Sequence, residues 1–395
     1  MKTIVSILGT SGASVKDCLP DKEFPPAVYD LSLFGKDDKE YKNSTEFLLD
    51  FFDGKFIFIG TKCAIEFQKA LLKDSLSDKD IEYIEVSDNE LDEIFENIFD
   101  ILESYEDILL DVTHGFRHQP IMAIFASTLS QFLDRKDLKI IFAKEEERNK
   151  RYKYIYLDEY IEITQISLIL TGFIRTLNFI PIKNIKLFNI KVFEDFSKSL
   201  LSNDLKGVEK NYILLKKELE ELFKNEELKH LSKLFKDIKN KLAPLDKLID
   251  KDTKIYQKYL TLSKITLDKN YLVVSLAYLF EAIREYCTYS LKSYIKDINI
   301  KKSYELNTAI MDTITNFKRN NRENTIQKKY PKLHLKNKNS FKRISVIYEE
   351  IRNLRNDLAH INYEKDFKDI KQMINSISFK VEAIFKDDVL KNIKL

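Results

Sequence analysis

The sequence predicts an α/β domain with a parallel sheet, followed by an all-α bundle, and three observations support this fold class. Short β-branched runs alternate with helical segments as far as Ile161, a pattern typical of a parallel sheet covered by helices. From Ile161 onward, the apolar spacing is almost wholly helical. Eight glycines and seven prolines occur in 395 residues, of which 32% are charged, and this composition favours helices with short loops.

Five β-branched, apolar runs in the first part of the chain are predicted to be strands, with helices between them. Because the intervening segments are mostly long enough to cross over a sheet, consecutive strands should run parallel, with helices on both faces. The expected strands are Lys2–Leu8, Phe56–Ile59, Ile81–Val86, Ile108–Val112 and Leu138–Phe142. The expected crossover helices are Ser44–Phe52, Lys62–Lys73, Asn89–Leu102 and Pro120–Phe132.

The chain from Ile161 to Leu395 is predicted to be a bundle of helices joined by loops rich in Lys and Asn. The sequence Ala243-Pro244-Leu245 predicts a helix break, because proline lacks the backbone donor that a helix needs. Residues 316–339, with eight Lys and Arg residues and little apolar periodicity, are expected to form a basic loop. Helical spacing is clearest at Tyr212–Phe223, Leu272–Tyr294 and Ser340–Leu358.

A chain of 395 residues is too long for one compact core of common size. We expect an α/β domain at residues 1–165, a helical connector at 166–200 and a helical domain at 201–395. Residues 1–165 hold 20 Lys and Arg and 34 Asp and Glu, a balance of −14, whereas residues 166–395 hold 45 and 29, a balance of +16. A long polyanion is therefore expected to bind the second half, although charged helices are often only solvated faces.

The three cysteines, Cys18, Cys63 and Cys287, lie far apart and show no metal-ligand spacing. This pattern indicates a reducing compartment, with neither a disulfide nor a zinc site, and we expect a cytoplasmic protein. The apolar run after Lys2 ends at Leu8, which is too short for a secretory signal. No segment is expected to span a membrane.

Glycine-rich and polar turns follow three of the predicted strands. Because ligands collect beyond the carboxyl ends of parallel strands, these turns are expected to form a pocket for a nucleotide-like ligand. They lack the G-x-G-x-x-G and Walker patterns, which argues against a dinucleotide site and against nucleoside triphosphate hydrolysis. The candidate ligand-binding residues are Gly9, Thr10, Ser11, Gly12, Gly60, Thr61, Lys62, Thr113, His114, Gly115, Phe116 and Arg117.

Structural roles are the alternative for these turn residues. A strand-end Gly-Thr pair is often an ordinary turn, His114 could be a hydrogen-bonded structural histidine, and Arg117 could pair with Asp111. The presence of three such turns favours ligand binding by His114 and Arg117. His118, at the edge of the next helical segment, is expected to be structural.

Arg355, Asn356 and His360 lie at the end of the predicted helix Ser340–Leu358 and are the residue types that cleave RNA without a metal ion. Histidine exchanges protons near neutral pH, guanidinium holds phosphate oxygens in a fixed fork, and an amide can orient them. Five helical residues rotate by about 500°, so Arg355 and His360 lie on different faces. A two-fold interface could bring the two sets together.

Two further charged residues, Glu281 and Arg284, lie on an otherwise apolar helical segment, where charged groups must be paired or functional. No carboxylate pair with metal spacing is near Arg355, Asn356 and His360, so no catalytic metal ion is expected. The structural alternative is a surface ion pair for Arg355 and a helix-ending role for His360.

Two family resemblances agree with this interpretation. Residues 1 to about 165, through Gly9-Thr10-Ser11-Gly12 and the segment D-V-T-H-G-F-R-x-x-P, resemble the Rossmann-like CARF domain of CRISPR-associated accessory proteins. Residues from about 200 to 395, through L-F-E-A-I-R-E and R-N-D-L-A-H, resemble a HEPN ribonuclease domain. Together the two halves are similar to the CARF–HEPN ribonucleases of type III CRISPR systems.

The resemblance implies a homodimer, open to higher assembly, whose CARF pair binds a cyclic oligoadenylate and activates a HEPN pair that cuts single-stranded RNA. Family likeness favours cyclic tetra-adenylate over cyclic hexa-adenylate as activator, and no cofactor is implied. The residues that match the ligand loops are Gly9, Thr10, Ser11, Gly12, Thr113, His114, Gly115 and Arg117. The residues that match the catalytic motif are Arg355, Asn356 and His360, with Glu281 and Arg284 as supports from a facing helix.

A non-enzymatic regulator is the alternative function. In that case, the α/β domain senses a nucleotide and the basic helices bind nucleic acid or a partner protein. A HEPN toxin unlinked to CRISPR is a third possibility, which would cut RNA without a messenger and leave the glycine turns of the first half unexplained.

Overall fold

The computed structural model describes two compact units, whose boundary falls between Leu168 and Ile169. The described residues are 2–10, 15–16, 18–20, 25–76, 78–87, 90–133, 137–179, 189–295, 298, 300, 302–359 and 366–395. Within these ranges, no helix combines the length and the apolar character that crossing a bilayer requires.

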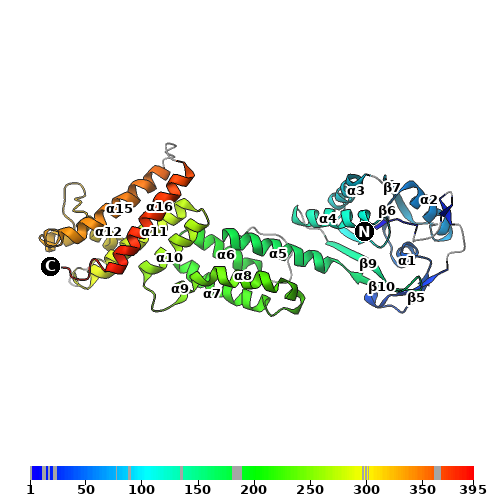
Figure 1. Cartoon of the computed structure of the whole chain (residues 1–395), viewed down its shortest axis with the longest axis horizontal. Coiled ribbons are helices and arrows are strands. Elements are labelled where there is room, and N and C mark those ends of the chain that lie inside the picture. Colours follow the sequence, from blue (N-terminus) through cyan, green and yellow to red (C-terminus); the bar gives the residue numbers. More distant parts are fainter. Residues whose placement is uncertain are drawn as a thin grey trace. The chain divides into compact units, whose positions relative to one another are not determined.

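The first unit is built on one eight-stranded sheet (Figure 1). Its five neighbouring strands β9, β8, β1, β6 and β7 run parallel, while β10 is antiparallel to β9 and parallel to β4, and β5 closes the edge antiparallel to β4. In sheet order the strands are β5 (Lys39–Tyr41), β4 (Ala27–Asp30), β10 (Arg151–Tyr156), β9 (Asp137–Glu147), β8 (Asp107–Asp111), β1 (Thr3–Ile7), β6 (Lys55–Gly60) and β7 (Asp80–Glu85). A separate pair, β2 (Val15–Lys16) and β3 (Leu19–Pro20), is antiparallel.

Two hydrophobic clusters cover the two faces of this sheet. Ile4 of β1 belongs to the cluster that includes α1 (Ser44–Phe51) and α2 (Lys62–Leu71). Val5, its neighbour in the strand, belongs to the cluster that includes α3 (Leu91–Ser104) and α4 (His118–Leu133). Side chains alternate between faces along a strand, so the central strands must be apolar throughout, and all five residues of β1 are buried.

The predicted fold class is confirmed, with corrections to the sheet. Each of the five predicted strands is present, but the sheet is mixed and has three more strands, β4, β5 and β10. These are edge-side strands with polar residues among the apolar ones, such as Arg151 and Lys153 of β10, so they lack the continuous β-branched run by which a buried parallel strand is recognised.

The expectation of unpaired cysteines is wrong. Cys18 and Cys63 form a disulfide, with their Cα atoms 4.8 Å apart, and this bond links the turn between β2 and β3 to the first turn of α2. Cys287 is free and buried. The two bonded cysteines are 45 residues apart in sequence, so their spacing could not reveal the pairing and carries no argument about the cellular compartment.

The second unit is helical. Its central helix α11 (Leu272–Lys292) packs against α10, α12, α15 and α16. The other helices are α6 (Ile190–Leu201), α7 (Leu205–Leu222), α8 (Ser232–Leu242), α9 (Asp246–Ile249), α10 (Ile255–Asp268), α12 (Ser303–Ile314), α13 (Thr325–Lys329), α14 (Leu333–Lys336), α15 (Lys338–Ala359) and α16 (Phe367–Asp387). Helix α5 (Asp158–Thr176) contains the boundary between the units. The short 3₁₀ helices of the chain are η1 (Ser32–Phe34), η2 (Lys73–Ser75), η3 (Glu226–Leu231) and η4 (Ala243–Leu245).

Two predictions about helix interruptions fare differently. The break at Ala243-Pro244-Leu245 is confirmed, because these residues form η4 between α8 and α9. The expected basic loop at 316–339 is wrong as a loop, since it contains α13, α14 and the first residues of α15. Asn324 caps α13, with its side chain accepting from the backbone N–H groups of Ile326 and Gln327. This cap stabilises a short helix that apolar periodicity does not predict.

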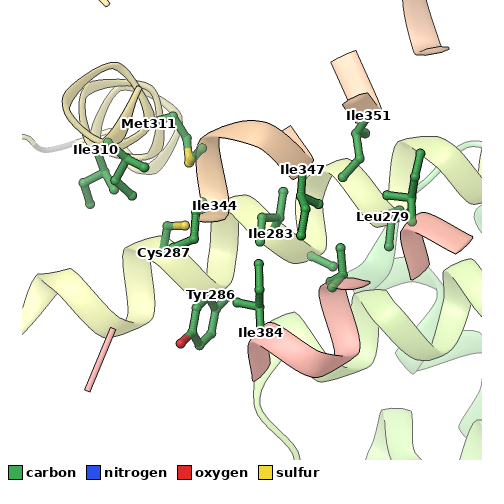
Figure 2. Packing of buried hydrophobic residues seen from close by; sticks show 14 of the residues in the cluster. Leu279, Ile283, Tyr286, Cys287, Ile310, Met311, Ile344, Ile347, Ile351 and Ile384 are labelled. Atoms are coloured by element: carbon green, nitrogen blue, oxygen red, sulfur yellow. The ribbon is translucent and has the colours of Figure 1, made fainter. Parts of the chain in front are cut away.

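The core of the second unit is formed mainly by α11, α15 and α16. Figure 2 shows Ile283 and Cys287 of α11 beside Ile344 of α15, with Ile384 of α16 close by. The side chains of Ile283, Cys287 and Ile344 are fully buried. These helices therefore hold the C-terminal turn of α15, which carries Arg355, against the middle of α11.

Replacing Ile344 by Ala should lower the free energy of unfolding by about 2–5 kcal/mol, because it leaves a cavity in this core. The matched control is Val346→Ala on the same helix, where the side chain is 48% exposed and the expected change is within about 0.5 kcal/mol. Urea unfolding of the full chain measures both values. Equal losses in the two variants would contradict the packing described.

Candidate functional site

A cavity of about 770 Å³ opens at the carboxyl ends of β1, β6 and β8 in the first unit. We call it the strand-end pocket. Its walls come from the residues after these three strands, from the start of α1 and α2, and from β4, β9 and β10. The lining residues are Leu8, Gly9, Thr10, Pro25, Ala27, Tyr29, Lys42, Asn43, Thr61, Cys63, Ala64, Thr113, His114, Gly115, Phe116, Phe142, Ala143, Glu145, Asn149 and Tyr152.

The three turns singled out in the sequence meet at this pocket. The predicted site residues that line it are Gly9, Thr10, Thr61, Thr113, His114, Gly115 and Phe116. Among the described residues, Gly60, Lys62 and Arg117 belong to the same turns but lie outside the lining. Lys62 and Arg117 are exposed. Ser11 and Gly12 lie outside the described residues.

The pocket also contains polar and aromatic residues that the sequence did not single out. Tyr29 of β4 and Tyr152 of β10 stack with ring centres 5.1 Å apart, and Lys42 also lines the pocket, with its ammonium donating to the carbonyl of Leu71 at 3.2 Å. Asn43 is the N-cap of α1 and accepts a hydrogen bond from the backbone N–H of Glu46. Only the capping pattern of Asn43 could have been found in the sequence, because β4 and β10 were not predicted.

Glycine is required where the turns after β1 and β8 approach each other. A Cβ atom on Gly9 would lie 2.7 Å from the backbone nitrogen of Gly115. Gly115 has φ +98°, and a Cβ there would lie 2.6 Å from Cγ2 of Ile7 and 2.7 Å from Oε1 of Gln119. A side chain at Gly9 would push the two turns apart, and one at Gly115 would collide with Ile7 of β1 and with Gln119 of α4. Gly60 has a similar packing role, with a Cβ position 2.9 Å from Cβ of Leu8.

A buried carboxylate, outside the pocket lining itself, holds together the segments that form the pocket. Asp111, at the end of β8, is fully buried and accepts hydrogen bonds from the hydroxyls of Ser6 at 3.0 Å, Ser44 at 3.1 Å and Thr113. The Thr113 hydroxyl in turn accepts from the backbone N–H of Ala143 at 2.9 Å. One side chain thus connects β1, α1 and the turn after β8, and through Thr113 it reaches β9.

A second set of hydrogen bonds holds the turn after β1. Gln68 of α2 donates from Nε2 to the carbonyl of Gly9 at 2.6 Å. Its Oε1 accepts from Nδ2 of Asn43 at 2.8 Å. Thr61 caps α2 by accepting from the backbone N–H of Ala64 at 3.3 Å. The residues around the pocket are therefore fixed before any ligand binds, which lowers the entropic cost of binding.

The turn after β8 has a structure of its own. Phe116 is 52% exposed and its ring is parallel to that of His118, with centres 6.0 Å apart. The backbone N–H of Phe116 donates to Oε1 of the buried Gln119 at 3.0 Å. The side chain of His118 therefore lies against an aromatic ring of the pocket lining, and the structural role expected for it stays a prediction.

The ionisation of His114 is set by burial and by Asp111. Loss of water contact is the larger effect and lowers the pKa of His114 below its ordinary value, while the Asp111 charge acts to raise it. Burial also raises the pKa of Asp111, against the effects of His114 and of its hydrogen bonds to Thr113 and Ser6. His114 is thus held neutral at pH 7, where its ring can both donate and accept hydrogen bonds.

In the second unit, Arg355 and Arg284 share an aromatic partner. The guanidinium carbon of Arg355 lies 5.1 Å from the centre of the Phe280 ring, and that of Arg284 lies 5.3 Å from it. Tyr348 stacks on the same ring with centres 5.2 Å apart. Arg284 is also 5.1 Å from the ring of Tyr304. We call these five residues the Phe280 cluster.

The two charged residues on α11 form an ion pair, which is one of the two alternatives that their position on an apolar helix allows. Arg284 is 5% exposed and donates from Nη1 to Oε1 of Glu281 at 2.8 Å. Arg355 and Asn356 are exposed near the end of α15. His360 lies outside the described residues, so its position relative to Arg355 stays a prediction. Phe280 could not be singled out in the sequence, because an aromatic residue on an apolar helix is most often part of a core.

Gly115→Ala should destabilise the full chain by about 1–3 kcal/mol, because alanine is strained at positive φ and its Cβ meets Ile7 and Gln119. Gly172→Ala is the matched control. A Cβ at this helical glycine meets no atom within 4 Å, and the change should raise stability by about 0.5–1 kcal/mol. Urea unfolding compares the two variants, and losses of similar size would disprove the strain at Gly115.

The pKa of His114, followed by its imidazole signals in NMR, should lie below 6.5. In Asp111→Asn it should fall further, because the charge that raises it is removed. A depressed pKa in the folded state stabilises the protein above pH 6.5, and this contribution is lost as pH falls through the folded value. Asp107→Asn, at the exposed start of β8, is the control and should leave the titration unchanged. A rise of the pKa in Asp111→Asn would contradict the coupling.

Comparison with known proteins finds a similar family for one segment of the first unit. No curated protein matches the chain. Residues 21–147 match the family model described as "CRISPR system endoribonuclease Csx1, CARF domain". The matched segment contains the turns after β6 and β8 and most of the pocket lining. This part of the chain is therefore similar to the CARF domain of Csx1, and the match supports a CRISPR type III accessory protein.

Proposed function

We propose that the chain is a cyclic oligoadenylate-activated, metal-independent endoribonuclease that cleaves single-stranded RNA in type III CRISPR defence in the cytoplasm. The observation that carries the proposal is the strand-end pocket, which lies largely within the segment similar to the Csx1 CARF domain. Cyclic tetra-adenylate is the favoured activator and cyclic hexa-adenylate the second candidate.

The pocket has the chemistry that an oligoadenylate needs. Tyr152 and Phe116 offer aromatic surfaces for adenine rings, and the buried Tyr29 supports Tyr152 by stacking against it. Thr10 offers a hydroxyl, and Lys42 can offer a charge to a phosphate by releasing its hydrogen bond to the carbonyl of Leu71. The neutral ring of His114 can donate to a ring nitrogen or accept from an amino group. The mixture of stacking and polar groups suits a nucleotide better than an apolar metabolite.

A symmetric dimer fits such a ligand. Cyclic tetra-adenylate has rotational symmetry, so the strand-end pockets of two copies could make the same contacts with its two halves. A composite catalytic site follows the same logic. Each copy would contribute Arg355, Asn356 and His360. Because a helix turns by about 100° per residue, Arg355 and His360 of one copy point in different directions, but residues from two copies could still meet in one site.

The chemistry at Arg355 is phosphate-directed. Its guanidinium is exposed and held against Phe280, where it can stabilise the charge that develops on a scissile phosphate. His360 would exchange the proton between the ribose 2′-hydroxyl and the leaving oxygen. Asn356 would orient the phosphate, and Glu281 would fix Arg284 behind the ring. The 2′-hydroxyl attack leaves a 2′,3′-cyclic phosphate on the product.

The direct test is to incubate the full chain with labelled single-stranded RNA in chelator, with no messenger, with cyclic tetra-adenylate or with cyclic hexa-adenylate. Messenger-dependent cleavage that yields a 2′,3′-cyclic phosphate is the expected result. Retention of RNA without cleavage would favour the non-enzymatic regulator. Cleavage that needs no messenger would contradict the proposed activation.

Arg355→Ala and His360→Ala should reduce the cleavage rate by at least about 100-fold while messenger affinity stays unchanged, because each removes a group that acts on the reacting phosphate. Arg343→Ala is the matched control, since Arg343 lies on the same helix and pairs with Asp387 at 2.8 Å. Single-turnover cleavage and messenger binding are measured for each variant. Loss of messenger binding in a folded Arg355→Ala protein would contradict the separation of the two sites.

Lys42→Ala should weaken messenger binding about tenfold, because it removes a cation from the pocket lining, whereas cleavage at saturating messenger should be kept. Arg117→Ala, at an exposed residue of the turn after β8, should also weaken messenger binding. Lys36→Ala, an exposed lysine outside the lining, is the control. Unchanged messenger affinity in Lys42→Ala would argue against the strand-end pocket as the messenger site.

A further inference from the structure

We propose that Tyr304 is a stacking platform for a nucleobase of single-stranded RNA, with Arg319 holding the neighbouring backbone. This inference rests on the proposed function for the identity of the substrate. It assigns the binding role to Tyr304, the member of the Phe280 cluster that lies on α12, and to Arg319 in the loop that follows α12.

Tyr304 is exposed but rigidly supported. It is 71% exposed, and its ring lies 5.1 Å from the guanidinium carbon of Arg284. Arg284 itself is fixed by Glu281 at 2.8 Å and by the Thr308 hydroxyl at 3.4 Å. A cation behind the ring leaves most of the tyrosine open to solvent, and an ordered aromatic ring loses little entropy when a base stacks on it.

The platform is close to the candidate catalytic residue. Arg355 contacts the ring of Phe280, Phe280 contacts Arg284, and Arg284 contacts Tyr304, with about 5 Å between partners at each step. A stacked single strand advances by about 3.4 Å per nucleotide. A base on Tyr304 therefore lies within a few nucleotides of a phosphate held by Arg355.

Arg319 supplies the charge next to the platform. Its side chain is 64% exposed and pairs with Asp312 through Nε at 2.7 Å. The Asp312 carboxylate raises the pKa of Arg319, and the Tyr304 and Tyr348 phenols are near enough to add to the effect. The ion pair fixes one edge of the guanidinium, so its remaining N–H groups can reach a phosphate.

The loop that carries Arg319 also combines an exposed aromatic ring with cationic side chains. Phe317 is 50% exposed, and Lys318, which pairs with Glu323 at 2.8 Å, and Arg322 flank Arg319 in a turn that contains Asn320 and Asn321 at positive φ. A backbone bridge joins Arg319 to Arg322. Exposed aromatic rings interleaved with cations are typical of single-stranded nucleic acid sites, where bases stack and the backbone is neutralised.

The affinity test uses the full chain and a fluorescent 2′-O-methyl RNA, which lacks the nucleophile for cleavage. Tyr304→Ala should raise the Kd about five- to a hundredfold, while Tyr304→Phe should keep the affinity because the stacking face remains. The matched control is Tyr289→Ala, since Tyr289 is 56% exposed and lies 5.8 Å from a Lys254 cation on another part of the unit. Similar affinity in Tyr304→Ala and wild type, or similar losses in Tyr304→Ala and Tyr289→Ala, would overturn the proposal.

A second variant tests the charge and guards against misfolding. Arg319→Ala should lower the slope of log Kd against log salt by about 0.7, the value for one phosphate contact on a single strand. Arg343→Ala, an exposed and ion-paired arginine of the same unit, should leave the slope unchanged. An unchanged slope in Arg319→Ala would exclude its phosphate contact.

The cleavage assay separates this inference from the proposed function. If the wild type cuts RNA with messenger, Tyr304→Ala should raise KM and leave kcat unchanged, and an unchanged KM would overturn the inference alone. If the wild type never cuts but binds RNA in a Tyr304-dependent way, the proposed activity fails and the stacking platform stands. A wild type that binds no RNA would overturn both.

Discussion

The buried carboxylate of Asp111 is the interaction on which the strand-end pocket depends. Removing such a charge from water costs several kcal/mol, and hydrogen bonds to charged groups each contribute about 1.5–3 kcal/mol. The hydroxyls of Ser6, Ser44 and Thr113 supply those bonds from three different parts of the first unit. The cost of burial therefore forces β1, α1 and the turn after β8 into one arrangement, and that arrangement creates the cavity.

The second unit solves a comparable problem with a different set of groups. Arg284 is nearly buried, and its charge is satisfied by Glu281, by Thr308 and by the faces of two aromatic rings. Because Phe280 contacts both Arg284 and Arg355, the exposed guanidinium is ordered by the same residues that satisfy the buried one. The packing around the buried Arg284 therefore also restricts the exposed Arg355, the residue proposed to contact the phosphate.

The sequence is informative where burial dictates residue type. Strands β1, β6 and β8 are buried almost throughout, so their β-branched runs could be recognised, and the ends of these runs located the three turns of the pocket. Strands β4 and β10 are short or partly polar, so the sequence pattern does not predict them. It therefore does not identify Tyr29 and Tyr152 as pocket residues either. The Cys18–Cys63 bond depends on a contact between segments distant in sequence, which no local pattern contains. Phe280 is indistinguishable in sequence from its apolar neighbours, and its role emerges only from what surrounds its ring.

The glycine contact at the base of the pocket has a consequence for experimental mapping. At Gly9 and Gly115 the backbones approach so closely that no side chain fits between them, so the polypeptide main chain itself forms the wall there. Truncating side chains one by one cannot delete such a surface, and a conventional alanine scan of the first unit would assign the recognition of a ligand to too few positions. Homologues could likewise exchange most of the surrounding side chains and still keep the shape of this wall, provided that both glycines are retained.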